Sequence, residues 1–169
     1  IYMMFYNKKY IIPFLLLILF HKNIIYLNDF VTITFLDVNQ GDSIFISYPN
    51  NKANILIDTG GNINSNYNIS TNKIIPYLKS IGLDHLDYLI ISHGDFDHMG
   101  EAINLVNNFK VEKVIFNCGE FNELENELIK ILYKKKIPYY SCIKELNIDD
   151  NKLYFLNNRD YDNENDNSS

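Results

Sequence analysis

Four side chains that can bind a metal ion lie within six consecutive residues, 93–98, of a segment reading Ser-His-Gly-Asp-Phe-Asp-His-Met-Gly. They are His93, Asp95, Asp97 and His98. Imidazole nitrogen and carboxylate oxygen are both ligands of divalent ions such as zinc and manganese. A polar loop whose aspartates cap the next helix is a simpler interpretation, and it would account for one histidine and one aspartate. Four ligands in the order H-x-D-x-D-H favour a metal site.

The candidate ligands follow an apolar run, residues 88–91, which predicts a buried strand. Two other predicted strands also end in loops that combine aspartate with glycine, residues 37–42 and 58–61. Reactive groups gather beyond the carboxyl ends of strands in open α/β sheets, so we expect the three loops to lie together. Asp58 is a candidate to orient a metal-binding histidine or to accept N–H groups of its own turn, and the two roles are compatible.

The remaining pattern predicts a layered α/β fold with a mixed sheet. Short strands separated by tight turns are expected at residues 31–38, 43–48 and 53–57, as an antiparallel meander. After the meander we expect helices near 74–81, 101–109 and 122–136, and strands at 87–92, 111–116, 139–143 and 152–156. Pro76 should delay or bend the first helix, and Asn122 with Glu125 forms a capping box for the last.

An apolar stretch, residues 10–27, precedes the domain and is at the short end of what spans a bilayer. A membrane helix, a secretory signal and a buried helix all fit it, but no small-x-small cleavage site follows. Lys8 and Lys9 come before it, so the positive-inside tendency places the residues after it outside the cytoplasm. We expect a membrane helix or anchor over 1–28, a domain over 29–156 and a polar acidic tail over 157–169.

The composition is that of a folding chain, with 47% hydrophobic and 21% charged residues. A formal charge of −6 excludes gripping a phosphate backbone by bulk charge. A polyanionic substrate would therefore need local features or bound metal for attraction. Three lysines, residues 134–136, suit the C-terminal end of a helix better than a nucleic-acid patch.

Cys118 and Cys142 are too far apart in sequence for a metal-binding CxxC motif. Each lies beside apolar residues, which favours two buried free thiols. A disulfide between the two cysteines is the alternative, and the sequence does not decide between them.

Four motifs occur in order: residues 35–43 (FLDVNQGDS), 57–61 (IDTGG), 75–78 (IPYL) and 92–100 (SHGDFDHMG). Together they resemble the metallo-β-lactamase-like domain at the C-terminus of ComEC-type competence proteins, which are inner-membrane channels for DNA uptake. The resemblance covers residues 31 to about 156. It implies the first half of an αββα sandwich, with single-stranded or degraded DNA and other DNA-uptake components as partners, and the extracytoplasmic location follows from the lysines above.

By that resemblance, His93 and Asp95 would bind one ion, and Asp97 and His98 a second. Asp97 would also be catalytic, and the ion pair would hold a hydroxide for attack on a phosphodiester. Behind these ligands the resemblance places three orienting carboxylates, Asp37, Asp42 and Asp58. Asp95 stands where most members of the superfamily have histidine, which moves preference from zinc towards manganese. Asn39 replaces a usual glycine, so its turn requires a positive φ that asparagine tolerates.

The family's remaining ligands have no counterpart, because no histidine follows His98. The sequence also begins at Ile1 rather than methionine. We therefore expect either a fragment of a metal-dependent hydrolase, inactive in isolation, or a degenerate remnant. The alternatives are a non-catalytic, membrane-attached half-domain and a hydrolase of the same fold acting on lactones, thioesters or RNA.

Overall fold

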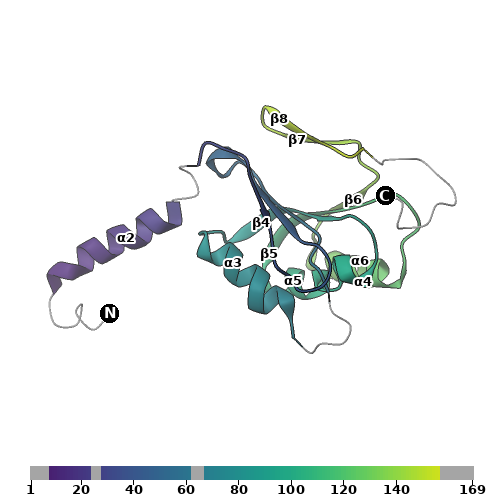
Figure 1. The fold of residues 1–169 in the computed structure, drawn as a ribbon, viewed down its shortest axis with the longest axis horizontal. Helices are drawn as coiled ribbons and strands as arrows, with labels where there is room; N and C mark the ends of the chain where they lie inside the picture. The colour runs from purple at the N-terminus through teal and green to yellow at the C-terminus, as the bar shows by residue number, and fades with distance from the viewer. Residues whose placement is uncertain (1–7, 24–27, 62–66, 157–169) are drawn as a thin grey trace.

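A six-stranded mixed sheet is the centre of the fold in the computed structural model, which describes residues 8–23, 28–61 and 67–156 (Figure 1). Its strands lie in chain order: β1 (Thr32–Phe35), β2 (Ile44–Ser47), β3 (Asn54–Ile57), β4 (His85–Ile91), β5 (Lys110–Phe116) and β6 (Tyr139–Ser141). β1, β2 and β3 pair antiparallel, whereas β3 to β6 pair parallel. The predicted α/β class with a meander and a mixed sheet is therefore confirmed.

Helices cover one face of this sheet (Figure 1). They are η4 (Ser70–Ile74), α3 (Ile75–Ser80), α4 (Phe96–Met99), α5 (Ala102–Asn108) and α6 (Glu123–Lys135). β4 alternates between the two faces: Leu89 and Ile91 are buried with the helices, and Ile90 is buried on the opposite face. A strand buried on both faces reads as the continuous apolar run seen in the sequence.

A two-stranded hairpin, β7 (Glu145–Ile148) and β8 (Asn151–Tyr154), lies over the other face (Figure 1). Ile148 is buried there beside Ile55 and Ile90. The sequence predicted a strand near β8 but missed β7. A two-residue turn connects β7 to β8, and Asp149 in this turn has a φ of 51°. Aspartate in so short a turn was the feature of the sequence from which the hairpin could have been predicted.

Local signals placed the helix ends well. The side chain of Asn122 accepts a hydrogen bond from the Glu125 amide, and the Glu125 carboxylate accepts one from the Asn122 amide, so the predicted capping box is confirmed. α6 ends at Lys135, and its C-cap residue Lys136 adopts the left-handed conformation. Pro76 lies in the first turn of α3, directly after the π-helical turn η4, so the expected late start is also confirmed.

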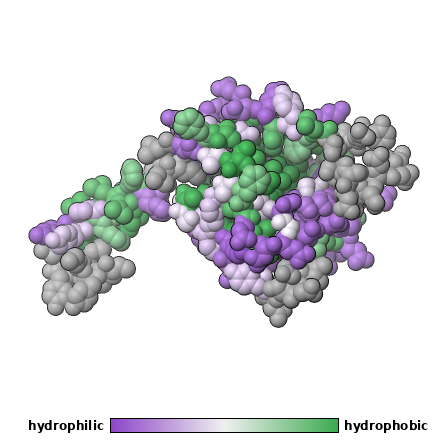
Figure 2. Space-filling model, in the orientation of Figure 1, coloured by the Kyte–Doolittle hydropathy of each residue, from purple (hydrophilic) through white to green (hydrophobic). Residues whose placement is uncertain are grey.

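The N-terminal part contains η1 (Lys8–Tyr10) and α2 (Ile11–Asn23). Apolar side chains lie along α2, and those from Ile11 to Phe20 are exposed (Figure 2). The sequence predicted a span over 10–27, of which residues 24–27 lie outside the described part. Among the residues that the structure describes, no helix combines the length and apolarity needed to cross a membrane. The one further short element is η3 (Pro49–Asn51), between β2 and β3.

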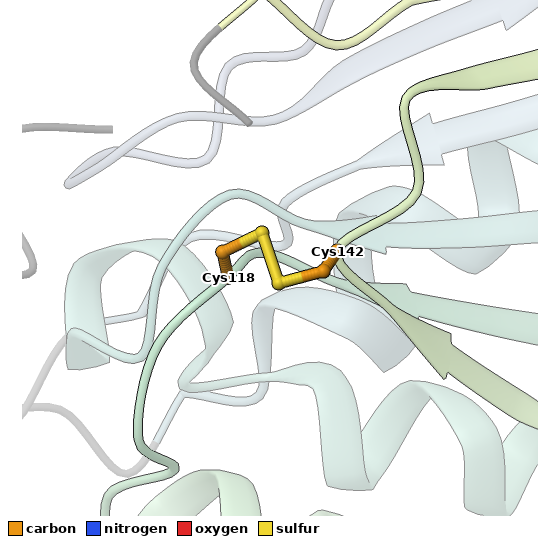
Figure 3. The surroundings of a disulfide bond; sticks show 2 residues. All are labelled: Cys118 and Cys142. Atoms are coloured by element: carbon orange, nitrogen blue, oxygen red, sulfur yellow. A yellow bond between two sulfur atoms is a disulfide. The ribbon is translucent and has the colours of Figure 1, made fainter. Parts of the chain in front are cut away.

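Cys118 and Cys142 form a disulfide bond, so the expectation of two buried free thiols was wrong (Figure 3). Parallel pairing of β5 with β6 sets Phe116 opposite Ser141, and each cysteine follows shortly after one of these strand ends. Cys142 is exposed and Cys118 half-buried. Apolar neighbours in sequence therefore misled the prediction, because the pairing of the two strands decides where the thiols meet.

Replacing both cysteines by serine should lower the free energy of unfolding by about 3 kcal/mol, since the bond closes a loop whose ends are 24 residues apart. Urea unfolding measures the difference. A reducing agent should lower the stability of the wild type by a similar amount and leave the double variant unchanged. Equal unfolding midpoints for the double variant and the oxidised wild type would contradict the prediction.

Candidate functional site

Parallel pairing of β3 and β4 brings two of the three predicted loops together. Ile57 pairs with Ile90, so Asp58 and Ser92 follow neighbouring strand ends, and the Asp58 amide donates to the Ile90 carbonyl at 2.9 Å. The loop at 37–42 reaches the same place through Gly41. A Cβ added to Gly41 would lie 1.6 Å from the Asp97 carbonyl oxygen, and its φ of 82° also suits glycine. The three loops therefore meet, as the sequence predicted.

The Asp58 carboxylate is the centre of the hydrogen bonds in this site. Its side chain is 5% exposed. Oδ1 accepts from the Ser92 amide at 2.9 Å, and Oδ2 accepts from the Ser92 hydroxyl at 2.5 Å and from His98 Nδ1 at 2.9 Å. Asp58 has a φ of 57°, an uncommon conformation for a residue with a side chain. Three hydrogen bonds to one carboxylate offset that backbone strain.

One arrangement of protons satisfies these contacts. The Ser92 hydroxyl has a single hydrogen, and the short contact with the Asp58 carboxylate requires that hydrogen. Ser92 Oγ then accepts from His93 Nδ1, which lies 3.1 Å away. His98 Nδ1 likewise carries its proton and donates it to Asp58. In its neutral form, each imidazole therefore keeps the Nε2 lone pair free for a ligand.

The two Nε2 atoms each lie near one of the candidate carboxylates. His93 Nε2 is 3.6 Å from Asp95 Oδ2, and His98 Nε2 is 3.9 Å from Asp97 Oδ2. Two ligands about 2.1 Å from a tetrahedral zinc ion are roughly 3.4 Å apart. The centroids of the two imidazole rings are 3.7 Å apart, so the two histidine–aspartate pairs are adjacent. The side chains of His93 and His98 are 12% and 18% exposed, and the two aspartate side chains are about 45% exposed. Both pairs are therefore accessible to solvent.

This donor set fits a divalent ion, but only as part of a complete coordination shell. Each pair supplies one nitrogen and one oxygen, a combination that suits zinc and does not select it over manganese. Within the described ranges, no three histidine, cysteine, aspartate or glutamate side chains converge closely enough to hold an ion. Zinc sites in proteins generally use three or four protein ligands. The four residues thus provide two half-shells, by which we mean two ligands for each of two ions.

The two other predicted carboxylates lie on the loop that contains Gly41. Asp37 is exposed and contacts Lys73, with 3.2 Å between Nζ and Oδ2. The amide of Asn39, and then Lys73, hold the pKa of Asp37 below its usual value. Asp42 is also exposed. In the described part of the chain, neither carboxylate hydrogen-bonds to a candidate ligand. Asn39 has the predicted positive φ, 68°.

Two polar residues make contacts in the site that the sequence did not predict. Ser92 relays hydrogen bonds between Asp58 and His93. Asn122 donates to the Gly94 carbonyl at 2.7 Å. A hydroxyl directly between a buried strand and the first histidine was a usable signal for Ser92, whereas the contact of Asn122 depends on the fold.

Comparison with known proteins agrees with this geometry. The family model described as the metallo-beta-lactamase superfamily matches residues 36–163. ComE operon protein 3 of Bacillus subtilis (strain 168) is 33% identical over 104 residues, and the match covers 56% of this chain and 13% of that protein. The predicted resemblance to ComEC-type competence proteins is therefore confirmed for this domain, which is a small part of the relative's length.

Proposed function

Because the chain belongs to the metallo-beta-lactamase superfamily, we propose that it is part of a metal-dependent hydrolase acting on phosphodiester bonds of DNA during uptake. The observation that carries the proposal is the pair of outward Nε2 atoms, each at ligand spacing from an aspartate. The likeness to ComE operon protein 3 supports the competence context, with other DNA-uptake components as partners.

The roles of the residues follow from the contacts. A divalent ion in such a site supplies Lewis acidity and lowers the pKa of bound water. His93 with Asp95, and His98 with Asp97, would hold two such ions, while Asp58 fixes the orientation of His98. Asp97 is the candidate proton acceptor, because its carboxylate is about half exposed and close to His98.

Charge supports a metal-dependent interaction with DNA. The chain has a formal charge of −6, so bulk charge would repel single-stranded or degraded DNA. Bound divalent ions would reverse that repulsion locally. Substrate attraction and chemistry would then depend on the same four ligands.

Two half-shells also support a second candidate function, a non-catalytic half-domain that keeps the fold. In the part of the chain that the structure describes, each ion would have two protein ligands, and catalytic zinc sites generally have three. The hydrolase therefore needs further ligands from elsewhere in the complete protein, and the experiment must use that protein.

In the complete protein, Asp97→Asn should lower the rate of single-stranded DNA cleavage by roughly two to four powers of ten, because the proton acceptor and an ion ligand are lost. Asp58→Asn should cost about one to two powers of ten, because it acts through His98. Cleavage assays with zinc and with manganese measure both, and Asp149→Asn, a surface change on the β7–β8 turn, is the control.

Near-full activity of Asp97→Asn together with an inactive Asp58→Asn would show that these roles are reversed. A complete protein that cleaves no phosphodiester with either ion would reject the hydrolase and favour the half-domain. Cleavage of lactones, thioesters or RNA alone would assign the fold another substrate.

We also propose that residues 1–28 attach the protein to a membrane, with the 29–156 domain and the polar 157–169 tail outside the cytoplasm. Exposed apolar side chains along α2 support attachment. Lys8 and Lys9 before α2 support the orientation. The Cys118–Cys142 disulfide supports an oxidising compartment independently.

A reporter fused after Asn28 should therefore be active only if it is a type that works outside the cytoplasm. The matched control replaces Lys8 and Lys9 by glutamate, which should weaken the orientation because it removes the positive charges. Strong activity of a cytoplasmic reporter with the native lysines would contradict this topology.

A further inference from the structure

Asn122 connects α6 to the loop that contains the candidate ligands. Its Oδ1 accepts from the Glu125 amide at 3.0 Å, which caps the helix. Its Nδ2 donates to the Gly94 carbonyl at 2.7 Å, between His93 and Asp95 in sequence. One amide side chain thus uses its acceptor for the helix and its donor for the loop.

The loop approaches the helix end so closely that only glycine fits. A Cβ at Gly94 would lie 2.1 Å from Asn122 Nδ2 and 2.7 Å from Glu125 Oε2. Gly94 is buried. The absence of a side chain at Gly94 is therefore what allows its carbonyl to reach Asn122.

Asn122 is itself held by a rigid element. Glu125 is 2% exposed, and its carboxylate accepts from the Asn122 amide at 2.8 Å. Leu128 and Leu132, on the same helix, are completely buried in the core. A hydrogen bond from this helix end therefore fixes the loop to the core.

The second pair of candidate ligands has a different support. The His98 carbonyl accepts from the Thr59 amide at 2.7 Å, and His98 Nδ1 donates to Asp58. Both contacts come from the loop after β3, whereas Asn122 comes from α6. Asp58 also reaches His93 through Ser92, so Asn122 is the support that a mutation can remove from the first pair alone.

We propose that Asn122 is a positioning residue for the His93–Asp95 pair, and that its amide sets the spacing between His93 Nε2 and Asp95 Oδ2. The inference rests on the proposed metal-binding function and adds a residue to it. Asn122 does not touch the ion or the substrate. It acts through the Gly94 peptide, so its loss should weaken one ion site and spare the other.

The decisive variants keep the helix cap and remove the donor. Aspartate and serine are both good N-cap residues, but neither can donate an amide hydrogen to the Gly94 carbonyl as asparagine does. Asn122→Asp also adds a charge, so Asn122→Ser shows whether that charge matters. Asn107→Asp, at an exposed position of α5, is the matched control for the charge.

The measurement is a zinc titration of the complete protein, followed by the side-chain nitrogen NMR signals of His93 and His98. Both capped variants should bind zinc roughly tenfold or more weakly at His93, and within about threefold of wild type at His98. Asn107→Asp should match the wild type at both. Thermal unfolding of each variant checks that the fold is kept.

The outcomes separate the two proposals. A complete wild-type protein in which neither histidine responds to zinc would overturn the proposed metal-binding function and this inference with it. A wild-type response at both histidines, with equal weakening at both or no weakening at His93 in the capped variants, would overturn only the role of Asn122.

Discussion

The buried carboxylate of Asp58 is the contact on which the candidate site depends. It accepts hydrogen bonds from Ser92 and His98 and, through the Ser92 hydroxyl, also fixes the proton position on His93. Leaving a buried donor without its acceptor costs about 1–3 kcal/mol, so losing this carboxylate would disturb the strand end as well as the rings. Asp58 keeps its strained φ because the hydrogen bonds to its carboxylate hold the residue in that backbone conformation.

Strand pairing determines why this carboxylate lies where it does. β3 and β4 are parallel neighbours, so their carboxyl ends meet and bring residues 58 and 92 together across 34 positions of sequence. The loop at 37–42 also reaches this site, because Gly41 lies close to the backbone of Asp97. α6 adds a support from the helical layer through Asn122. The candidate ligands thus belong to a short loop that is held by contacts from both layers.

Features determined by neighbouring residues could be predicted from the sequence. The capping box of Asn122 with Glu125, the positive φ of Asn39 and the meander followed by alternating elements all depend on local chemistry or periodicity. The disulfide and the contact of Asn122 with Gly94 depend on which distant segments pair. Strand register decides these, and it is not visible in composition or spacing. The four candidate ligands and their division into two pairs were predicted by resemblance, but the contacts that support each pair were not.

The central claim is that Asp58 and Ser92 hold both imidazoles with Nδ1 protonated and Nε2 free. Two-bond proton–nitrogen NMR correlation of His93 and His98 in the absence of metal measures this directly. The account predicts the Nδ1–H tautomer for both rings in the wild type, and loss of that preference at His98 in Asp58→Ala. A proton on Nε2 of either ring in the wild type would contradict it.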